Sequence, residues 1–455
     1  METLQMIAAL IIGIVFLIFL IVKTKVHTFL ALLIACVVIG VISGMVPASI
    51  VSAIQGGFGT TLGNIGIIIG FGIMMGQIFQ ASGAAERMAR TFLKLFGKKR
   101  EEVALALTGF VVSIPVFCDS GFIILSPIAK ALSKKTKKSI VGLTVPLAAG
   151  LVITHSMVPP TPGPLGVAGI FGIDIGMFLL IGLVVFCVPM TIATTIYGKW
   201  LGKKIYQLPE EDGEGWVRPP YQEPIYDLTS DESTRQLPST FMSFAPLILP
   251  VILILLNTVL NALGFTEGIF AVLIFLGAPI IAVGIGLLLA IYTLAFKTER
   301  KVVLEDMEKG LRVAGMILLV TGGGGALGRI LQESGVGLFF AEQIAATPIP
   351  LFLLPFLVAT LVRFVQGSGT VAMITSASIT APIVEAAGGN LMLAALAACA
   401  GSLFFSYFND SYFWVVNRLS GINEAKEQIR VWSITSTIAW GIGLVILFIV
   451  SFFLN

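Results

Sequence analysis

The fold is decided by the stretch THSMVPPTPGP, residues 154–164. It follows an apolar run, residues 147–153, that is typical of a membrane-spanning helix. Its four prolines prevent that helix from continuing, because proline lacks a backbone N–H and clashes with the preceding turn. Inside a bilayer, irregular backbone is tolerated only where protein buries it or where it lines a watery cavity. A broken helix that carries Thr154, His155 and Ser156 is therefore a candidate binding site at membrane depth, as in secondary transporters.

The composition is that of an integral membrane protein. The chain is 56% hydrophobic and 12% charged, with a mean hydropathy of +0.99, whereas about 25% of residues are charged in soluble proteins. Its net charge of +3 does not indicate nucleic acid as a partner, because the basic residues lie between apolar runs. The four cysteines stand alone in apolar segments. We expect them to be packing residues, with no disulfide, metal site or cofactor.

The chain divides into two halves, residues 1–202 and 241–455. Between them, residues 203–240 are rich in Pro, Glu, Asp and Ser without apolar periodicity, which predicts a solvated cytoplasmic linker. Each half has helical spans, an interrupted apolar stretch and a broken helix. The expected spans are 4–22, 26–46, 61–82 and 165–197, then 241–263, 268–296, 311–331 and 431–454. The interrupted stretches are 103–132 and 349–387, and the broken helices are 140–164 and 391–416.

The basic residues predict the topology, because Lys and Arg concentrate on the cytoplasmic side. All but Arg329 and Arg363 fall in loops that can be placed inside together. The stretch 103–132 has basic clusters at both ends and is too short for two crossings of about 20 residues each, which predicts a re-entrant hairpin entering from inside. The stretch 349–387 lacks flanking Lys or Arg and is expected to enter from outside. Both termini are then predicted to lie outside.

The two halves are predicted to form an inverted repeat, because the first half starts outside the membrane and the second half starts inside. Residues 76–83 (GQIFQASG) resemble residues 328–335 (GRILQESG), and Ser120–Gly121 matches Ser368–Gly369. The predicted fold is an all-α polytopic membrane protein. Each half contributes one re-entrant helical hairpin and one broken helix, a common build for secondary transporters.

Three motifs resemble the gluconate permease family. They are residues 117–127 (FCDSGFIILSP), the pair Thr154–His155 with the proline run 159–164, and residues 366–372 (QGSGTVA), which are similar to the family's second hairpin. The likeness runs along essentially the whole chain in the same order. It implies a proton-coupled symporter for sugar acids such as gluconate in the bacterial inner membrane, within the ion transporter superfamily. It also implies that hairpin tips and helix breaks hold the substrate, while a transport domain moves as an elevator against a homodimeric scaffold.

The chain departs from the better-known gluconate carriers at its expected site. They have Glu-Val-Gly where this chain has Asp119–Gly121, and His where it has Thr161. Known variations of the family carry D-serine or glycerate, so a different small carboxylate is the alternative substrate.

Three ionisable residues are candidates for carrying the coupling proton. An ionisable side chain at membrane depth costs several kcal/mol unless it is paired or hydrated, which marks Asp119, His155 and Asp410. Asp119 is the first candidate, because a carboxyl group shielded from water retains a proton more readily; the alternative is a cap on the hairpin's second helix. His155 can equally be a satisfied core residue, and Asp410 a helix cap.

The substrate-binding candidates lie at the same interruptions. Hydroxyl groups, amide groups and closely approachable glycine backbone suit a hydroxylated anion near helix N-termini. Arg363 suits a carboxylate because of its guanidinium geometry, or it pairs with Asp410 or Glu385. The remaining candidates are Ser120, Gly121, Thr154, His155, Ser368, Gly369, Thr370 and Asn409.

Other classes fit the sequence less well. A channel gives no reason for paired hairpins of opposite orientation, and an intramembrane enzyme lacks a catalytic motif such as HExxH. The glycine run 322–325 lacks the ending of a phosphate-binding loop, which favours close helix packing. A Na⁺-coupled carrier of another carboxylate is the remaining alternative.

Overall fold

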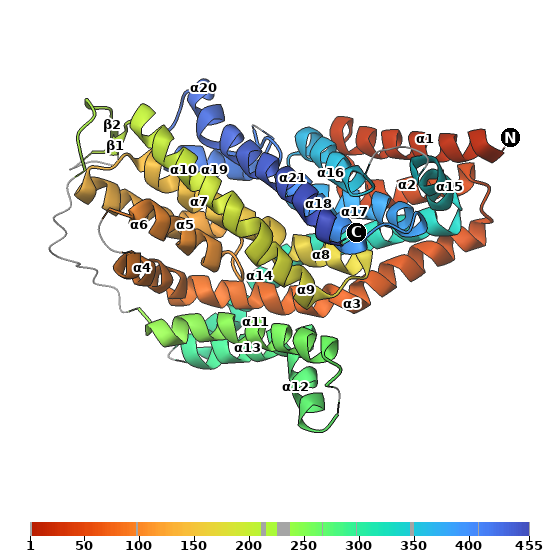
Figure 1. The fold of residues 1–455 in the computed structure, drawn as a ribbon, viewed down its shortest axis with the longest axis horizontal. Helices are drawn as coiled ribbons and strands as arrows, with labels where there is room; N and C mark the ends of the chain where they lie inside the picture. Colours follow the sequence, from red (N-terminus) through yellow and green to blue (C-terminus); the bar gives the residue numbers. More distant parts are fainter. Residues whose placement is uncertain are drawn as a thin grey trace.

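The computed structural model describes residues 2–96, 99–210, 215–224, 237–265, 267–296, 298–345, 350–407 and 409–454. The described chain is helical except for one two-stranded antiparallel sheet, β1 (Leu208–Pro209) with β2 (Trp216–Val217). The molecule is elongated, with the sheet near one end and the N-terminus at the other (Figure 1). Helices α11 to α13 form a layer along α3, and α12 projects away from the body (Figure 1).

The first half contains ten α-helices within the described residues, and they follow the expected order. They are α1 (Glu2–Lys23), α2 (Thr28–Ile42), α3 (Pro47–Ser82), α4 (Ala84–Phe96), α5 (Glu101–Val112), α6 (Cys118–Thr136), α7 (Ile140–Met157), α8 (Pro162–Phe171), α9 (Ile175–Leu180) and α10 (Val188–Lys204), with a π-helical segment (Ile181–Cys187) between α9 and α10.

The second half has eleven α-helices in the part of the chain that the structure covers. They are α11 (Thr240–Ala262), α12 (Ile269–Gly277), α13 (Pro279–Leu294), α14 (Arg300–Glu333), α15 (Val336–Ala345), α16 (Leu353–Gln366), α17 (Gly369–Ala386), α18 (Leu391–Gly401), α19 (Ser411–Leu419), α20 (Ala425–Gln428) and α21 (Ile434–Leu454), with a second π-helical segment (Ile429–Ser433) before α21.

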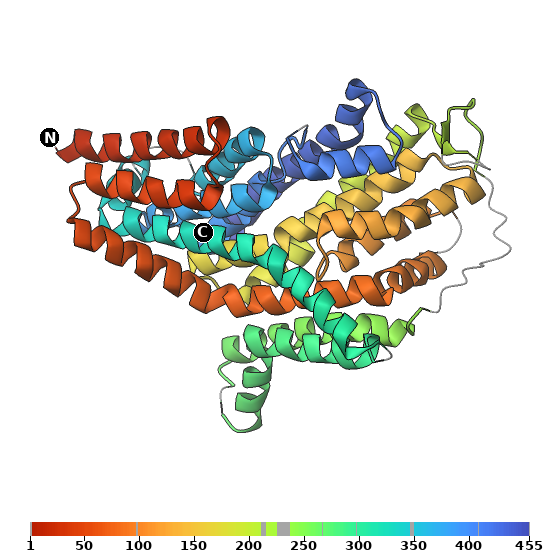
Figure 2. The ribbon, with the colours of Figure 1, turned by 180° about the vertical axis from the view of Figure 1, so that it is seen from behind.

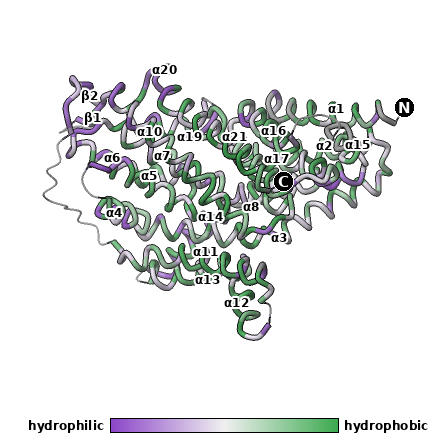
Figure 3. Tube along the Cα trace, viewed as in Figure 1, coloured by the Kyte–Doolittle hydropathy of each residue, from purple (hydrophilic) through white to green (hydrophobic). Residues whose placement is uncertain are grey.

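Seven helical stretches in the described residues are long and apolar enough to cross a membrane. An eighth is the pair α12–α13, which bends by 72° at Gly277–Ala278. The chain is therefore a multi-pass membrane protein. Hydrophilic residues gather at the end that carries β1, β2 and α4, while green apolar helices fill the middle (Figure 3).

Both interrupted stretches and both broken helices are pairs of helices in the structure. The pairs are α5–α6 and α16–α17, then α7–α8 and α18–α19. The first residue of the stretch 349–387 and Phe408 in the second break lie outside the described residues.

Four expected helix boundaries are wrong, and one of them is the start of the helix expected over 311–331, since α14 begins at Arg300. The helix expected over 61–82 begins at Pro47, because its glycine-rich first part packs along α14 and needs little hydropathy of its own. The helix expected over 165–197 is two elements: Leu165 belongs to α8, the chain turns at Gly172 with φ +66°, and Asp174 caps α9. The helix expected over 268–296 breaks before Pro279, which starts α13.

The long helices α3 and α14 pack against each other and cross the molecule together (Figure 2). A side chain on Gly57 would lie 2.9 Å from Cα of Ala326, and one on Gly325 would lie 2.7 Å from the carbonyl oxygen of Gly57. Small residues at such crossings let helix backbones approach closely. The glycine run is thus a packing surface, as the sequence predicts.

The beginning of the predicted linker is buried rather than solvated. Ile205, Gln207 and Leu208 are no more than 6% exposed. The backbone N–H of Ile140 donates to the carbonyl of Gln207 at 2.9 Å, so this segment covers the start of α7. Residues 211–214 and 225–236 of the linker lie outside the described residues.

Candidate functional site

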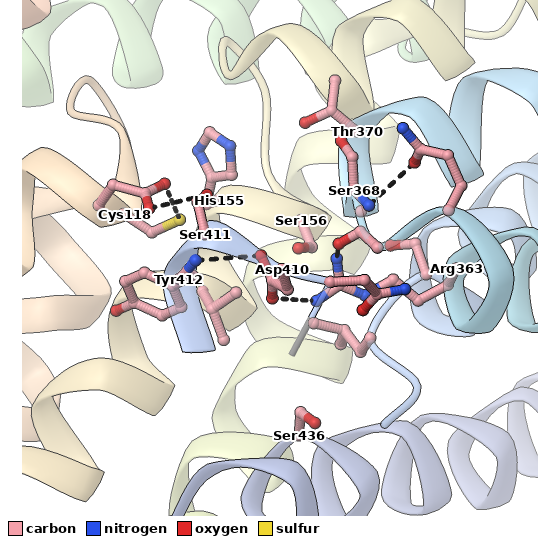
Figure 4. A pocket seen from close by; sticks show the side chains of 18 of the residues that line it. Cys118, His155, Ser156, Arg363, Ser368, Thr370, Asp410, Ser411, Tyr412 and Ser436 are labelled. Carbon is pink, nitrogen blue, oxygen red and sulfur yellow. Dashed lines mark hydrogen bonds and ion pairs between the residues drawn. The ribbon is translucent and has the colours of Figure 1, made fainter. Parts of the chain in front are cut away.

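A polar cavity of about 300 Å³ lies where the interrupted helices meet. Its walls come from the starts of α6, α17 and α19, the ends of α7, α16 and α18, and the segment before α21 (Figure 4). The predicted site residues that line it are Asp119, His155, Arg363, Ser368, Gly369, Thr370, Asn409 and Asp410.

Three helix N-termini converge on this cavity. The first residues of α6, α17 and α19 all contribute to its lining. Ser368 caps α17 by accepting from the N–H of Val371 at 3.3 Å, and Asp410 caps α19 by accepting from Tyr412 N at 3.1 Å. The N-terminal end of a helix carries partial positive charge and free N–H groups, so this arrangement favours an anion.

Arg363 and Asp410 form a buried ion pair at the cavity wall. The guanidinium Nη2 lies 2.6 Å from Oδ2 of Asp410, and the side chains are 6% and 9% exposed. Arg363 also donates to the carbonyl of Gly367, and Ser406 donates to Asp410 while accepting from Nε1 of Trp432 at 2.8 Å. The pairing predicted as one alternative for Arg363, and the capping predicted for Asp410, are thus confirmed.

One donor of Arg363 is not used by this network. Its buried Nε has no hydrogen-bond partner among the described residues. Because Arg363 lines the cavity, its guanidinium remains a candidate contact for a bound carboxylate.

Asp119 makes fewer and longer hydrogen bonds than Asp410. Oδ1 accepts from the hydroxyl of Ser411 at 3.3 Å, and Oδ2 lies 3.6 Å from Sγ of Cys118. Asp119 forms no ion pair with any residue that the structure describes. The capping alternative is wrong, because α6 begins after Phe117 without a side-chain cap. Asp119 is therefore a half-buried carboxyl group on the cavity surface.

His155 lies on the cavity face of α7. Val152, His155 and Ser156 all line the cavity, as the three- and four-residue spacing of a helix face requires. The His155 ring packs 5.4 Å from the ring of Phe117, and its Nδ1 has no partner among the described residues. The side chain can therefore offer a nitrogen to a ligand.

Three predicted binding residues do not line the cavity. Thr154 is fully buried on another face of α7, one residue and about 100° away from His155. Gly121 packs against α7, where a side chain would lie 2.7 Å from Cδ2 of Leu151. Ser120 is half-buried outside the lining. Gly121 has a packing role in place of a binding one.

Sequence reasoning missed several lining residues. Gln366, Gly367 and Ser411 lie within or next to the interruptions, so they could have been found by including every neighbour of a break. Trp432 lies in the π-helical segment before α21, and Ser436 lies in α21, the last helix of the second half. Nothing in their local sequence pattern distinguishes them from packing residues. The other missed residues are Cys118, Val152, Ser402, Leu403 and Tyr412, whereas Ser156, named at the helix break, does line the cavity.

The overall fold resembles two solved transporter structures. YdaH of Alcanivorax borkumensis superposes with a TM-score of 0.62 at 14% identity, over 89% of each chain. MtrF of Neisseria gonorrhoeae superposes with a TM-score of 0.63 at 13% identity, over 96% of this chain and 97% of that one. The fold and the polar cavity define the class as a multi-pass membrane protein with a transporter fold.

The sequence then places the chain within that class. It matches the GntP family permeases over residues 5–453, and the chain belongs to that family. A Pseudomonas aeruginosa gluconate permease is 36% identical over 96% of this chain and 95% of its own. An uncharacterized permease of Haemophilus influenzae is 49% identical (96% and 90%), and the inner membrane permease YgbN of Escherichia coli is 32% identical (98% of both). The predicted family resemblance is confirmed, and the protein is a permease, not an enzyme.

Proposed function

We propose that this permease carries a small hydroxy-carboxylate, gluconate or a related sugar acid, into the cell together with a proton. The observation that carries the proposal is the charge arrangement of the cavity. Three helix N-termini and the free Nε of Arg363 favour a carboxylate, while Asp119 supplies a carboxyl group outside any described ion pair. Relatives named as gluconate permeases support the substrate class.

The cavity also suits the rest of a sugar acid. Ser156, Ser368, Thr370 and Asn409 line it and bring hydroxyl or amide groups to a space of about 300 Å³. That volume is at the small end of ligand sites.

The arrangement of helices supports an inverted repeat with two re-entrant hairpins. Gly57 of α3 meets Gly325 of α14, and Ile73 meets Gly310, so the two helices run antiparallel. Each ends at a glycine with positive φ, Gly83 and Gly335, in the similar motifs at opposite ends. In our proposal α5–α6 and α16–α17 are the hairpins, α7–α8 and α18–α19 the broken helices. A π-helical segment lies in the closing helix of each half.

Cellular placement and motion follow from the same proposal. The protein would lie in a bacterial inner membrane, as the name of YgbN states for that relative. The basic loops and the linker would face the cytoplasm, and both termini the outside. A homodimeric scaffold and an elevator motion of the hairpins and broken helices rest on the family resemblance.

The test is uptake of labelled gluconate into proteoliposomes under an imposed inward proton gradient. Wild type should accumulate gluconate above equilibrium, and Asp119→Asn should only equilibrate it, because the amide cannot carry a proton. Asp174→Asn is the matched control, since Asp174 is an exposed cap of α9 outside the cavity. It should accumulate gluconate like wild type.

The other outcomes separate the parts of the proposal. Uptake of D-serine or glycerate in place of gluconate would replace the substrate and keep the coupling. Accumulation driven by a Na⁺ gradient alone would replace the coupling ion. Equal accumulation by wild type and Asp119→Asn would remove Asp119 as the proton carrier.

A further inference from the structure

A second cavity, of about 260 Å³, lies beside the N-terminal end of α7, away from the first cavity. Its walls come from the start of α5, the connection between α6 and α7, the start of α7, the end of α10 and the chain after α10. Gly142 and Gly202 line it where α7 and α10 cross, and a side chain on Gly202 would lie 2.6 Å from Cα of Gly142. Segments far apart in sequence therefore build one defined hollow.

The aromatic wall of this cavity is held in place. The hydroxyl of Tyr206 donates to the carbonyl oxygen of Lys137 at 2.8 Å. The ring of Tyr206 meets that of Tyr221 edge-on at 5.2 Å. These contacts hold the chain after α10 against the connection between α6 and α7.

Positive charge dominates the lining. Lys138 is held by Glu101 and Glu102, with Nζ–Oε2 distances of 2.7 and 2.8 Å, so this part of the charge is compensated. Lys199 and Lys203 stand four residues apart on one face of α10, are exposed, and form no ion pair with a described residue. The lysines of the lining are Lys99, Lys137, Lys138, Lys199 and Lys203, against one carboxylate, Glu102.

The position of the cavity is that of a membrane interface. Trp200 is 53% exposed beside Lys199 and pairs with Tyr197, at a ring distance of 5.7 Å. Ile192 and Ile196, two turns and one turn earlier on α10, are 55% and 65% exposed, as lipid-facing residues are. Aromatic residues mark the headgroup level of a bilayer, and lysines mark its cytoplasmic side.

We infer that this second cavity binds a phosphate group. Lysine ammonium groups bind phosphate as compact point charges, and basic pockets between helices on the cytoplasmic side bind anionic lipid headgroups. The phosphate can come from an anionic phospholipid or from a soluble phosphate. Because the cavity joins the start of α5, the connection between α6 and α7, the start of α7 and the end of α10, a bound phosphate holds these parts together and stabilises the folded protein.

The test is thermal unfolding of the purified full-length protein in detergent, with phosphatidylglycerol, phosphatidylcholine or inorganic phosphate added at constant ionic strength. Phosphatidylglycerol should raise the Tm of wild type, and phosphatidylcholine should not. The variant Lys199→Gln/Lys203→Gln should bind phosphatidylglycerol roughly 30-fold more weakly, because each lysine near an anionic surface strengthens binding about fivefold. Both lysines are exposed, so the variant should fold.

The matched control is Lys23→Gln/Lys25→Gln, which removes two exposed lysines far from this cavity. A loss confined to the α10 variant supports the phosphate site with a lipid source. The same loss for inorganic phosphate supports it with a soluble source. Equal loss in both variants, or no anion effect on wild type, overturns the inference in favour of a diffuse basic surface.

Discussion

The two acidic residues of the first cavity have different surroundings, and these suit different roles. Asp410 accepts hydrogen bonds from Arg363, Ser406 and the backbone of Tyr412, so its negative charge is held in place. Asp119 accepts from Ser411 at 3.3 Å and has only a thiol beside its other oxygen. In the proposed function Asp119 carries the moving proton, whereas Asp410 is held in the ion pair with Arg363.

The first prediction at this scale concerns the ion pair of Arg363. Arg363→Gln should destabilise the protein by about 3–5 kcal/mol, because it leaves the carboxylate of Asp410 buried and unpaired. Arg363→Gln/Asp410→Asn removes both charges and should recover most of that loss. Neither variant should transport, since both lack the guanidinium. Thermal unfolding and uptake measure the two effects separately.

Arg329→Gln is the control for this prediction. Its ion pair with Glu333, at 2.5 Å, is 53% and 34% exposed, so its loss should change stability by less than about 1 kcal/mol. A double variant that transports like wild type would show that Arg363 serves structure alone.

The second prediction concerns Lys138, outside the membrane-spanning segments. Burial alone would lower the pKa of Lys138, but hydrogen bonds and charges from Glu101 and Glu102 raise it above its usual value. A lysine whose folded pKa is raised contributes stability below its unfolded pKa of about 10.4 and loses it as pH rises through the folded pKa. Wild type should therefore keep this contribution from pH 7 to 9 and lose it in more alkaline solution.

Lys138→Gln should lower the Tm by several degrees at pH 7, because Glu101 and Glu102 stay buried without their cation. Its melting curves should lack the additional alkaline loss of wild type. Lys204→Gln, an exposed change at the end of α10, should leave both the Tm and its pH profile unchanged. An alkaline loss of the same size in Lys138→Gln would place its origin elsewhere.

At the scale of helices, close crossings fix where the broken helix α7 lies. A side chain on Gly150 of α7 would lie 2.9 Å from the backbone N of Phe110 in α5, and one on Gly109 would lie 2.9 Å from the N of Leu151. Both obstacles are backbone, which cannot rotate away. The hairpin candidate α5–α6 is thus held directly against the helix that carries His155.

We predict that Gly150→Ala separates these two helices. It should lower the Tm by several degrees and reduce uptake, because α7 must move and its cavity face moves with it. Gly63→Ala is the matched control: nothing lies within 4 Å of the added atom, and alanine favours a helix over glycine by about 1 kcal/mol. Equal Tm values for the two variants would contradict the tight crossing.

The breaks in the helices could be predicted from the sequence, whereas the face that each residue presents could not. The prolines within 159–164 interrupt a helix for reasons that need no tertiary context, and Asp410 caps the helix that follows the second break. Thr154 and His155 are neighbours at one break, yet only His155 reaches the cavity, because the rotation of α7 depends on its packing. Trp432 completes the cavity from a closing helix, which only the tertiary fold brings there.

At the scale of the whole molecule, the inverted repeat predicts which ends share a side of the membrane. The first half would start outside and end inside at Lys204, and α11 would return the chain to the outside before Glu267. A helix of 23 residues such as α11 is long enough for that crossing. Leu4 and Glu267 should therefore lie on the side opposite to Lys204.

Cysteine labelling tests this arrangement, and the four native cysteines are all buried, which keeps the background low. Leu4, Lys204 and Glu267 are exposed, so single cysteines there should not disturb packing. A membrane-impermeant maleimide should label Leu4→Cys and Glu267→Cys in intact spheroplasts, and Lys204→Cys only after permeabilisation. Labelling of Lys204→Cys in intact spheroplasts would reverse the orientation. If Leu4→Cys and Lys204→Cys were labelled from the same side, the first half would cross the membrane an even number of times, and the inverted repeat would fail with it.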